Sequence, residues 1–264
     1  MSEENTAFVL VERQDFWARL TLNRPRISNA ADMAGWQMIG DEVAKLAKDP
    51  DLRVLYVTGA GERAFMAGAD MSEFPKIVAS RDSIKAYLAR VSRACDQLEA
   101  LDIPVIAEIN GACIGGGLEL ACACDYRIAV EGSKFSIPSA DVGLGLAYKD
   151  IARVAGLIGT MRTRELLLFG KAYDAAQAHA VGLINEVVPR ERLFERSAEL
   201  GRTLAQKAPL AIASSKKVLL SVVHAREPYF EQAMESIYVA WESEEMKRRV
   251  NKPKSEPKSE PKSK

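Results

Sequence analysis

Hydrophobic positions along the first sixty residues follow two different periods. Short apolar runs bounded by polar residues occur over 7–14 and 16–25, and they predict the two strands of a hairpin. From Ala30 to Ala47 apolar side chains recur at helical spacing, which predicts an amphipathic helix. The run 53–59 is continuously apolar, as expected for a strand that is buried on both faces.

Strands and helices keep alternating as far as about Lys149, which indicates an α/β layered fold. The pattern predicts a helix over 81–101 and a buried strand over 104–109. A second helix is predicted after Gly115–Gly117, and another strand over 126–130. Beyond Lys149 the pattern is mostly helical, with one short strand near the end of "AVGLINEVVP".

Three regions follow from these patterns. Residues 1–205 form the α/β core, and 206–250 form a helical region that must pack on the core, on a neighbouring subunit, or on both. The tail, 251–264, repeats Lys-Ser-Glu-Pro without large apolar residues, so we predict that it is disordered.

Charge and composition exclude several classes of protein. Lys and Arg together number 36, as do Asp and Glu, so no overall field favours nucleic acid or a membrane surface. No apolar stretch approaches the length of a membrane-spanning helix, and "MSEENTAFVL" lacks the features of a secretory signal. Four cysteines in apolar or helix-like segments are interpreted as reduced, buried thiols without a metal, in a cytoplasmic protein.

The stretch "NGACIGGGLELACACD", 110–125, combines three glycines with a single carboxylate, Glu119, among apolar and small residues. Glycines cost backbone entropy and a buried carboxylate costs desolvation, so the combination needs a reason. If a helix begins near Gly116, that residue and Glu119 share one face. The N–H groups at the helix start could then stabilise an oxygen gaining negative charge, beside a carboxylate placed to move a proton. The alternative is a glycine-rich turn with a structural glutamate.

A second loop, "ERAFMAGADMSEF", also follows a buried strand and precedes a helix-like segment. It contains Ala67 to Asp70, whose small side chains would let the backbone approach a ligand. Two backbone N–H groups converging on one carbonyl oxygen form an oxyanion hole. The pair of loops therefore favours catalysis over a structural role.

Other catalytic and nucleotide-binding motifs are absent from the sequence. There is no G-x-x-x-x-G-K-[ST] phosphate loop, no complete G-x-G-x-x-G after a strand, and no G-x-S-x-G elbow. We therefore expect no ATP, NAD or flavin cofactor.

The chain resembles the enoyl-CoA hydratase/isomerase (crotonase) family over residues 6–245. Four stretches carry the likeness: "LNRPRISNA", "AFMAGADMSEF", "NGACIGGGLELACACDYRIA" and "GKAYDAAQAHAVGLINEVVP". The resemblance implies a crotonase-like spiral of ββα units with a helical C-terminal oligomerisation region, assembled as a homotrimer or hexamer.

The resemblance also implies roles for individual residues. It places the thioester oxygen between the N–H groups of Ala67 and Gly116, with Glu119 as the principal acid or base. Coenzyme A, a part of the substrate rather than a separate cofactor, would pass residues of three loops: Arg24, Arg26, Ala67, Gly68, Ala69, Asp70, Met71 and Gly115.

The sequence departs from the family pattern at "FSIPSADVGLGLAYKD". Typical hydratases carry a second glutamate, and Ser139 stands at its position, where a hydroxyl cannot act as a comparable acid or base. Asp141 lies two residues on and would share the side of Ser139 in an extended segment; otherwise it caps a turn or loop. "DVGL" also resembles dienoyl-CoA isomerases. Near the C-terminus, the segment after Trp241 is highly charged where many members have a longer amphipathic helix.

The sequence is compatible with three functions. The first is hydration of a 2-enoyl-CoA thioester by Glu119, with Asp141 as a possible helper. The second is a double-bond isomerase that uses a single carboxylate. The third is an acyl-CoA-binding subunit without catalysis. In each case the expected partners are an acyl-CoA thioester and copies of the same chain, with neither nucleic acid nor a membrane.

Overall fold

The computed structural model describes residues 7–224, 238, 241–244, 247–248 and 251. The larger of its two sheets has the strand order β1-β2-β3-β5-β7-β10. These strands are β1 (Val9–Gln14), β2 (Trp17–Leu22), β3 (Val54–Gly59), β5 (Val105–Ile109), β7 (Tyr126–Val130) and β10 (Glu186–Val188). β1 and β2 pair antiparallel, which confirms the hairpin, and the other neighbours pair parallel.

Both faces of the larger sheet are covered, which explains its continuously apolar central strands. Leu55 and Val57 of β3 face the main core, whereas Val54 and Tyr56 face a smaller cluster that includes Leu193 of α8 (Leu193–Ala205). All six residues of β3 and all five of β5 are buried. The prediction of doubly buried strands is confirmed.

A second sheet, which the sequence patterns did not reveal, has the order β4-β6-β8-β9. Its strands are β4 (Ala64–Met66), β6 (Ala112–Ile114), β8 (Lys134–Ser136) and β9 (Tyr173–Asp174). Each of three successive units places one strand in the larger sheet, one in the smaller sheet, and then a helix. These ββα units bring the loops after β4, β6 and β8 to one side of the small sheet.

The helices begin at recognisable caps. Asp32 accepts a hydrogen bond from the Gly35 N–H at 2.6 Å at the start of α1 (Met33–Leu46), and Ser80 caps α3 (Arg81–Glu99) in the same way. The remaining helices before α8 are α2 (Phe74–Ile77), α4 (Gly116–Cys122), α5 (Ser139–Val142), α6 (Tyr148–Leu168) and α7 (Ala175–Ala180), and the 3₁₀ turns are η1 (Pro25–Ile27), η2 (Met71–Glu73) and η3 (Arg190–Arg192). The predicted helices over 30–47 and 81–101 correspond to α1 and α3.

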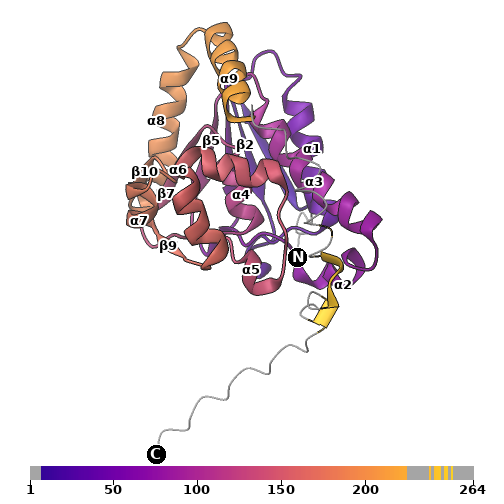
Figure 1. The fold of residues 1–264 in the computed structure, drawn as a ribbon. Coiled ribbons are helices and arrows are strands. Elements are labelled where there is room, and N and C mark those ends of the chain that lie inside the picture. Colours follow the sequence, from indigo (N-terminus) through magenta and orange to yellow (C-terminus); the bar gives the residue numbers. More distant parts are fainter. Residues whose placement is uncertain (1–6, 225–237, 239–240, 245–246, 249–250, 252–264) are drawn as a thin grey trace, which may run out of the picture.

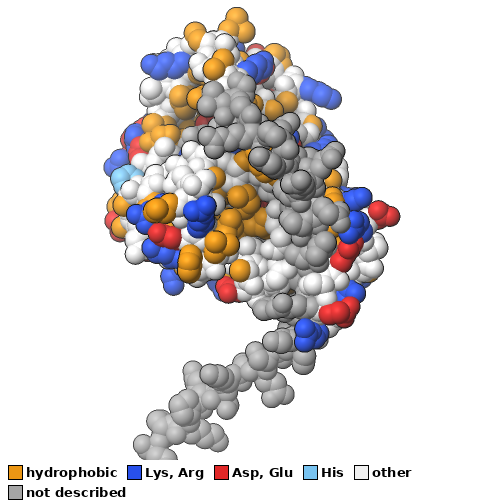
Figure 2. Space-filling view, viewed as in Figure 1, with side chains coloured by type: hydrophobic (Ala, Val, Ile, Leu, Met, Phe, Trp, Pro, Cys, Tyr) orange, Lys and Arg blue, Asp and Glu red, His pale blue; other side chains and the backbone are white. Residues whose placement is uncertain are grey.

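The C-terminal region is helical, as predicted, and α9 (Pro209–His224) is its longest described element. α8 and α9 lie at one end of the molecule and α5 at the other (Figure 1). Hydrophobic side chains gather at the α9 end in Figure 2, where Leu210 and Leu219 are exposed. The predicted disordered tail lies, except for Asn251, outside the described residues.

The four cysteines, Cys95, Cys113, Cys122 and Cys124, are free and buried, as the sequence predicted. In the part of the chain that the structure describes, no cluster of three His, Cys, Asp or Glu residues could hold a metal ion. The same residues include no helix that is both long and apolar enough to cross a bilayer.

Candidate active site

A cavity of about 180 Å³ lies where the loops after β4, β6 and β8 meet α3 and α6. Its wall is largely apolar and includes Tyr87, Leu88, Val91, Leu144, Leu146 and Trp241. Three polar side chains, those of Glu119, Ser139 and Asp150, also line it. An apolar cavity with a few polar groups is the usual form of a small-molecule site.

The two glycine-containing loops meet at this cavity. Gly68 has a positive φ of 87°, and a Cβ atom there would lie 2.9 Å from the Ile114 carbonyl oxygen and 3.0 Å from the Gly116 nitrogen. Since real Cβ atoms rarely approach other atoms so closely, only glycine allows this contact. The structure therefore brings together the two loops that the sequence singled out.

The first loop offers a different backbone N–H from the one predicted. The Ala67 N–H donates a hydrogen bond to the Ser28 carbonyl oxygen at 2.9 Å, so it is already used within the protein. Ala69 and Ala31 form an isolated parallel β-bridge. Its two hydrogen bonds run from the Ala31 N–H to the Gly68 carbonyl oxygen and from the Asp70 N–H to the Ala31 carbonyl oxygen, so neither uses the Ala69 N–H. No bond of the Ala69 N–H occurs among the described residues, and Ala69 lines the cavity. This geometry moves the expected donor from Ala67 to Ala69.

On the second loop, α4 begins at Gly116, as predicted. The Gly115 N–H donates to the Ser136 carbonyl oxygen at 2.8 Å, whereas Gly116 lies in the first turn, where N–H groups lack an intrahelical acceptor. Gly115 itself adopts a positive φ of 54°. Both glycines line the cavity, so the Gly116 N–H is available at its surface.

Glu119 lies one turn into α4 and is only 3% exposed. Its Oε1 atom has no hydrogen-bond partner among the described residues. Burial, and after it the negative charge of Asp150, raise the pKa of Glu119 to about 8, while Arg153 opposes both effects. The carboxyl group is therefore protonated at neutral pH, and a buried acid with an unused oxygen in a cavity is typical of a catalytic group.

Asp141 does not accompany Ser139 into the cavity. The segment forms α5 rather than an extended strand, and residues two apart in a helix point in different directions. Ser139 is buried and lines the cavity, whereas Asp141 is exposed, with its carboxylate beside Gly170. The expectation that Asp141 assists Glu119 rested on an extended backbone and is revised.

A second carboxylate, which the sequence analysis missed, does reach the cavity. Asp150, in the first turn of α6, is 1% exposed and lines the cavity together with Glu119. Burial raises the pKa of Asp150 to about 6, with Arg153 acting in the opposite direction. Its sequence, "AYKDIAR", resembles any first turn of a charged helix, so only the packing of α6 reveals its position.

Trp241 is the other residue that the sequence did not single out. It is 1% exposed, stacks on Phe74 with ring centroids 5.4 Å apart, and donates from Nε1 to the Gly145 carbonyl oxygen at 2.6 Å. The charged segment "WESEEMKRR" thus begins with an aromatic side chain that closes the cavity. Glu242 anchors the same turn through an ion pair of 2.7 Å with Arg81.

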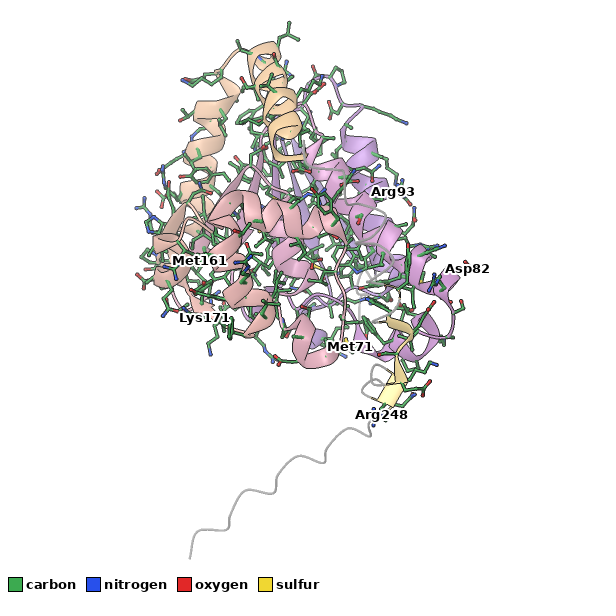
Figure 3. The ribbon with its side chains drawn as sticks, viewed as in Figure 1. Met71, Asp82, Arg93, Met161, Lys171 and Arg248 are labelled. Carbon is green, nitrogen blue, oxygen red and sulfur yellow. The ribbon has the colours of Figure 1, made fainter. Side chains whose placement is uncertain are left out.

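The residues predicted to contact coenzyme A divide into two groups. Ala67, Ala69 and Met71 line the cavity together with Gly115, and Met71 lies at the end of the molecule opposite α9 (Figure 3). Gly68 and Asp70 alternate with them and do not line the cavity, and Asp70 instead caps η2 by accepting from the Ser72 N–H at 3.0 Å. Arg24 and Arg26 lie outside the cavity, at η1; Arg24 pairs with Asp32 and Arg26 is exposed.

Comparison with known proteins identifies the family of the chain. A sequence model of the enoyl-CoA hydratase/isomerase family matches residues 12–252, which is most of the chain. The chain belongs to the enoyl-CoA hydratase/isomerase family. Members of this family are enzymes, and the acyl-CoA substrate class that the resemblance implied agrees with the match.

Named relatives indicate the range of activities within the enoyl-CoA hydratase/isomerase family. A crotonyl-CoA hydratase of Syntrophomonas wolfei subsp. wolfei is 33% identical over 221 residues, which cover 82% of this chain and 81% of that protein. A carnitinyl-CoA dehydratase of Citrobacter koseri is 34% identical over 200 residues, 75% of each chain. A crystal structure from Magnetospirillum magneticum, described as an enoyl-CoA hydratase/carnithine racemase, has a TM-score of 0.80 at 32% identity and covers 91% of this chain and 90% of its own. The predicted crotonase fold is confirmed.

Proposed function

We propose that the protein adds water reversibly to the double bond of a 2-enoyl-CoA thioester. One observation carries the proposal: the buried carboxyl group of Glu119, with an unpartnered oxygen, lies in an apolar cavity where the N–H groups of Ala69 and Gly116 are also available. The relatives named as hydratases and dehydratases support the same reaction type.

The two N–H groups would act on the thioester oxygen. Addition of water to C3 pushes the electrons of the double bond toward this oxygen and forms an enolate. Donors fixed in place for that charge contribute about 2.7–4 kcal/mol each, because they need no reorganisation during the reaction. The missing Cβ of Gly68 allows the two loops that carry these N–H groups to approach each other closely.

Glu119 would supply the proton that completes the addition. Because burial keeps the pKa of Glu119 at about 8, the group carries a proton at neutral pH and can give it to C2 of the enolate. In the reverse direction the same residue, as a carboxylate, removes that proton. The apolar wall, including Leu144 and Leu146, would hold the acyl chain in the meantime.

Coenzyme A would leave the cavity past Met71, which is exposed. Arg24 and Arg26 lie in the segment that contacts this loop, since Ser28 accepts the hydrogen bond of Ala67. We propose that one or both arginines bind the phosphates of the coenzyme, for which guanidinium groups are well suited.

A second candidate function is a double-bond isomerase. The observation that favours it is Ser139, which lines the cavity where the family's hydratases carry a second glutamate. One carboxylate can remove a proton from C2 of a 3-enoyl thioester and return it at C4. Parallel assays with 2-enoyl-CoA and 3-enoyl-CoA separate the two reactions.

The test is the loss of the conjugated thioester absorbance of crotonyl-CoA and of longer enoyl-CoAs. We expect Glu119→Gln to lower kcat by about 10²–10⁴-fold, the usual contribution of a general acid or base. Glu131→Gln is the matched control, since Glu131 is exposed and outside the cavity. Folded protein that binds coenzyme A thioesters and hydrates none of them would contradict the proposal and favour a binding subunit.

A further inference from the structure

We infer that Asp150 is the second acid–base residue of this pocket and accepts the proton of the attacking water. The inference rests on the proposed hydration, and it fills the role for which Ser139 has no ionisable group. It also goes beyond that proposal, because the glutamate of typical hydratases is replaced here by a residue of another helix, eleven positions further along the chain.

The position of Asp150 is the first argument. It lies in the first turn of α6, which packs against α4, and its side chain lines the same cavity as that of Glu119. Both residues are almost completely buried, at 1% and 3% exposure. Ion pairs at the surface would be enough to hold α6 against its neighbours. A buried carboxylate at the cavity wall is not needed for that purpose, and this suggests a role in the chemistry.

The second argument is how Asp150 is held. Arg153, with only 1% of its side chain exposed, donates from Nη1 to Oδ1 of Asp150 at 2.7 Å. The Ser92 hydroxyl lies 3.4 Å from Oδ2, a long contact. One carboxylate oxygen is therefore fixed by a charged hydrogen bond, and the other is left with a weak one. This arrangement orients the carboxylate and leaves its second oxygen available to accept a proton.

The third argument is the shared charge of Arg153. The same guanidinium also donates to Glu99 at 2.9 Å and pairs with Asp96, so one cation serves three carboxylates. Lys149 offsets part of this excess through Asp96, at 3.2 Å. Arg153 therefore orients Asp150 through a short ion pair while it also contacts two other carboxylates.

The groups that surround Asp150 set its protonation. They are Arg153 on α6, Glu119 on α4, and Tyr87, Ser92, Cys95, Asp96 and Glu99 on α3. Burial holds the pKa of Asp150 at about 6, below that of Glu119 at about 8. Arg153 hydrogen-bonds directly to Asp150, which favours the negative charge on this residue and leaves the proton on Glu119, as a base and an acid in one addition require.

The proposed step balances in atoms and charge. The water oxygen bonds to C3 while Asp150 accepts one of its protons, and the electrons of the C2–C3 double bond move through C2–C1 to the thioester oxygen. The enolate then takes the Glu119 proton at C2 and restores the thioester carbonyl. Asp150 is now protonated and Glu119 ionised, and a proton passes from the first to the second through solvent before the next cycle.

The test separates hydration from proton transfer at C2. Butyryl-CoA has no double bond, and exchange of its C2 protons in D₂O, followed by NMR, requires only Glu119 and the two N–H groups. We expect Asp150→Asn to lower the kcat of crotonyl-CoA hydration by about 10²–10⁴-fold and to change the exchange rate by less than about tenfold. Glu119→Gln should abolish both hydration and exchange. Asp141→Asn makes the same chemical change at an exposed aspartate and should affect neither reaction.

A pH profile supplies the second readout. For the wild type, kcat/KM should rise as Asp150 ionises near pH 6 and fall as Glu119 ionises near pH 8. The remaining activity of Asp150→Asn should lack the acidic limb. Unchanged hydration in Asp150→Asn would overturn the inference. Equal loss of hydration and exchange would also overturn it, because it would indicate that Asp150 has a structural role. A wild type that hydrates no enoyl-CoA would instead contradict the proposed function.

Discussion

At the scale of single residues, Glu119 lowers the stability of the folded protein in a pH-dependent way. An exposed glutamate ionises near pH 4.3, whereas burial holds the pKa of Glu119 at about 8. Between these values the folded state binds a proton that the unfolded state has lost. Stability therefore falls as pH rises through this interval.

Replacing the carboxyl group should remove this dependence. We predict that Glu119→Gln melts at a higher temperature than the wild type, and that the difference grows from pH 5 to pH 8. Each kcal/mol corresponds to about 2–4 °C in a domain of this size. Circular dichroism melts at several pH values measure the difference, and Glu131→Gln should track the wild type. A difference that stays constant between pH 5 and pH 8 would contradict the prediction, because a glutamate that is already ionised in the folded state does not titrate in this range.

Residues differ in how far the sequence could place them. Glu119 and Gly116 were predictable, because a glycine run before an isolated acid has few structural explanations. Asp141 was misplaced because its side depends on whether 139–142 is extended or helical, and four residues carry too little periodicity to decide. Asp150 could not be found from its neighbours, since its importance comes from the packing of α6 on α4.

At the scale of elements, the contact between the loops after β4 and β6 depends on one missing side chain. A Cβ at Gly68 would press on both Ile114 and Gly116, whose N–H is the proposed oxyanion donor. The short strands that carry these loops were not predictable, because three residues such as Ala64–Met66 are too few to show an alternating pattern. The buried strand β3 was predictable, because its six residues are enough to show a continuous apolar run.

We predict that Gly68→Ala lowers kcat by about 10²-fold, since displacement of a catalytic group by about 1 Å has an effect of that size. Gly132→Ala is a matched control. Gly132 has a similar positive φ of 82°, but a Cβ there would meet nothing within 4 Å. Both variants place alanine at a positive φ and so carry the same backbone strain. Only Gly68→Ala also separates the loops after β4 and β6. Crotonyl-CoA hydration measures the loss of kcat, and a thermal melt measures the loss of stability. Equal kinetics in the two variants would contradict the proposed role of the contact.

At the scale of the whole molecule, the end formed by α9 exposes apolar surface. Leu210, Val218 and Leu219 are 84%, 60% and 62% exposed, and monomeric proteins seldom leave such side chains together in solvent. The described structure is a single chain, so these residues are a candidate subunit interface. The homotrimer or hexamer expected from the family resemblance would cover them.

We predict by native mass spectrometry an assembly of three chains of 28.9 kDa, or of six. Leu219→Glu should shift the population toward the single chain, because a buried charge without a partner is costly. Val11→Glu introduces the same charge at a partly exposed position on β1 and should leave the mass unchanged. A wild type with the mass of one chain would contradict the prediction.

Trp36 and Trp241 stand 205 positions apart in the chain, and both line the same cavity. The apolar pocket therefore forms only after contacts of very long range have closed, and such contacts slow folding because closing long loops costs entropy. The two sheets alone do not complete the pocket, because Trp241 belongs to the C-terminal region. Activity would then report completed folding, and reactive thioester chemistry would be confined to molecules that have finished it.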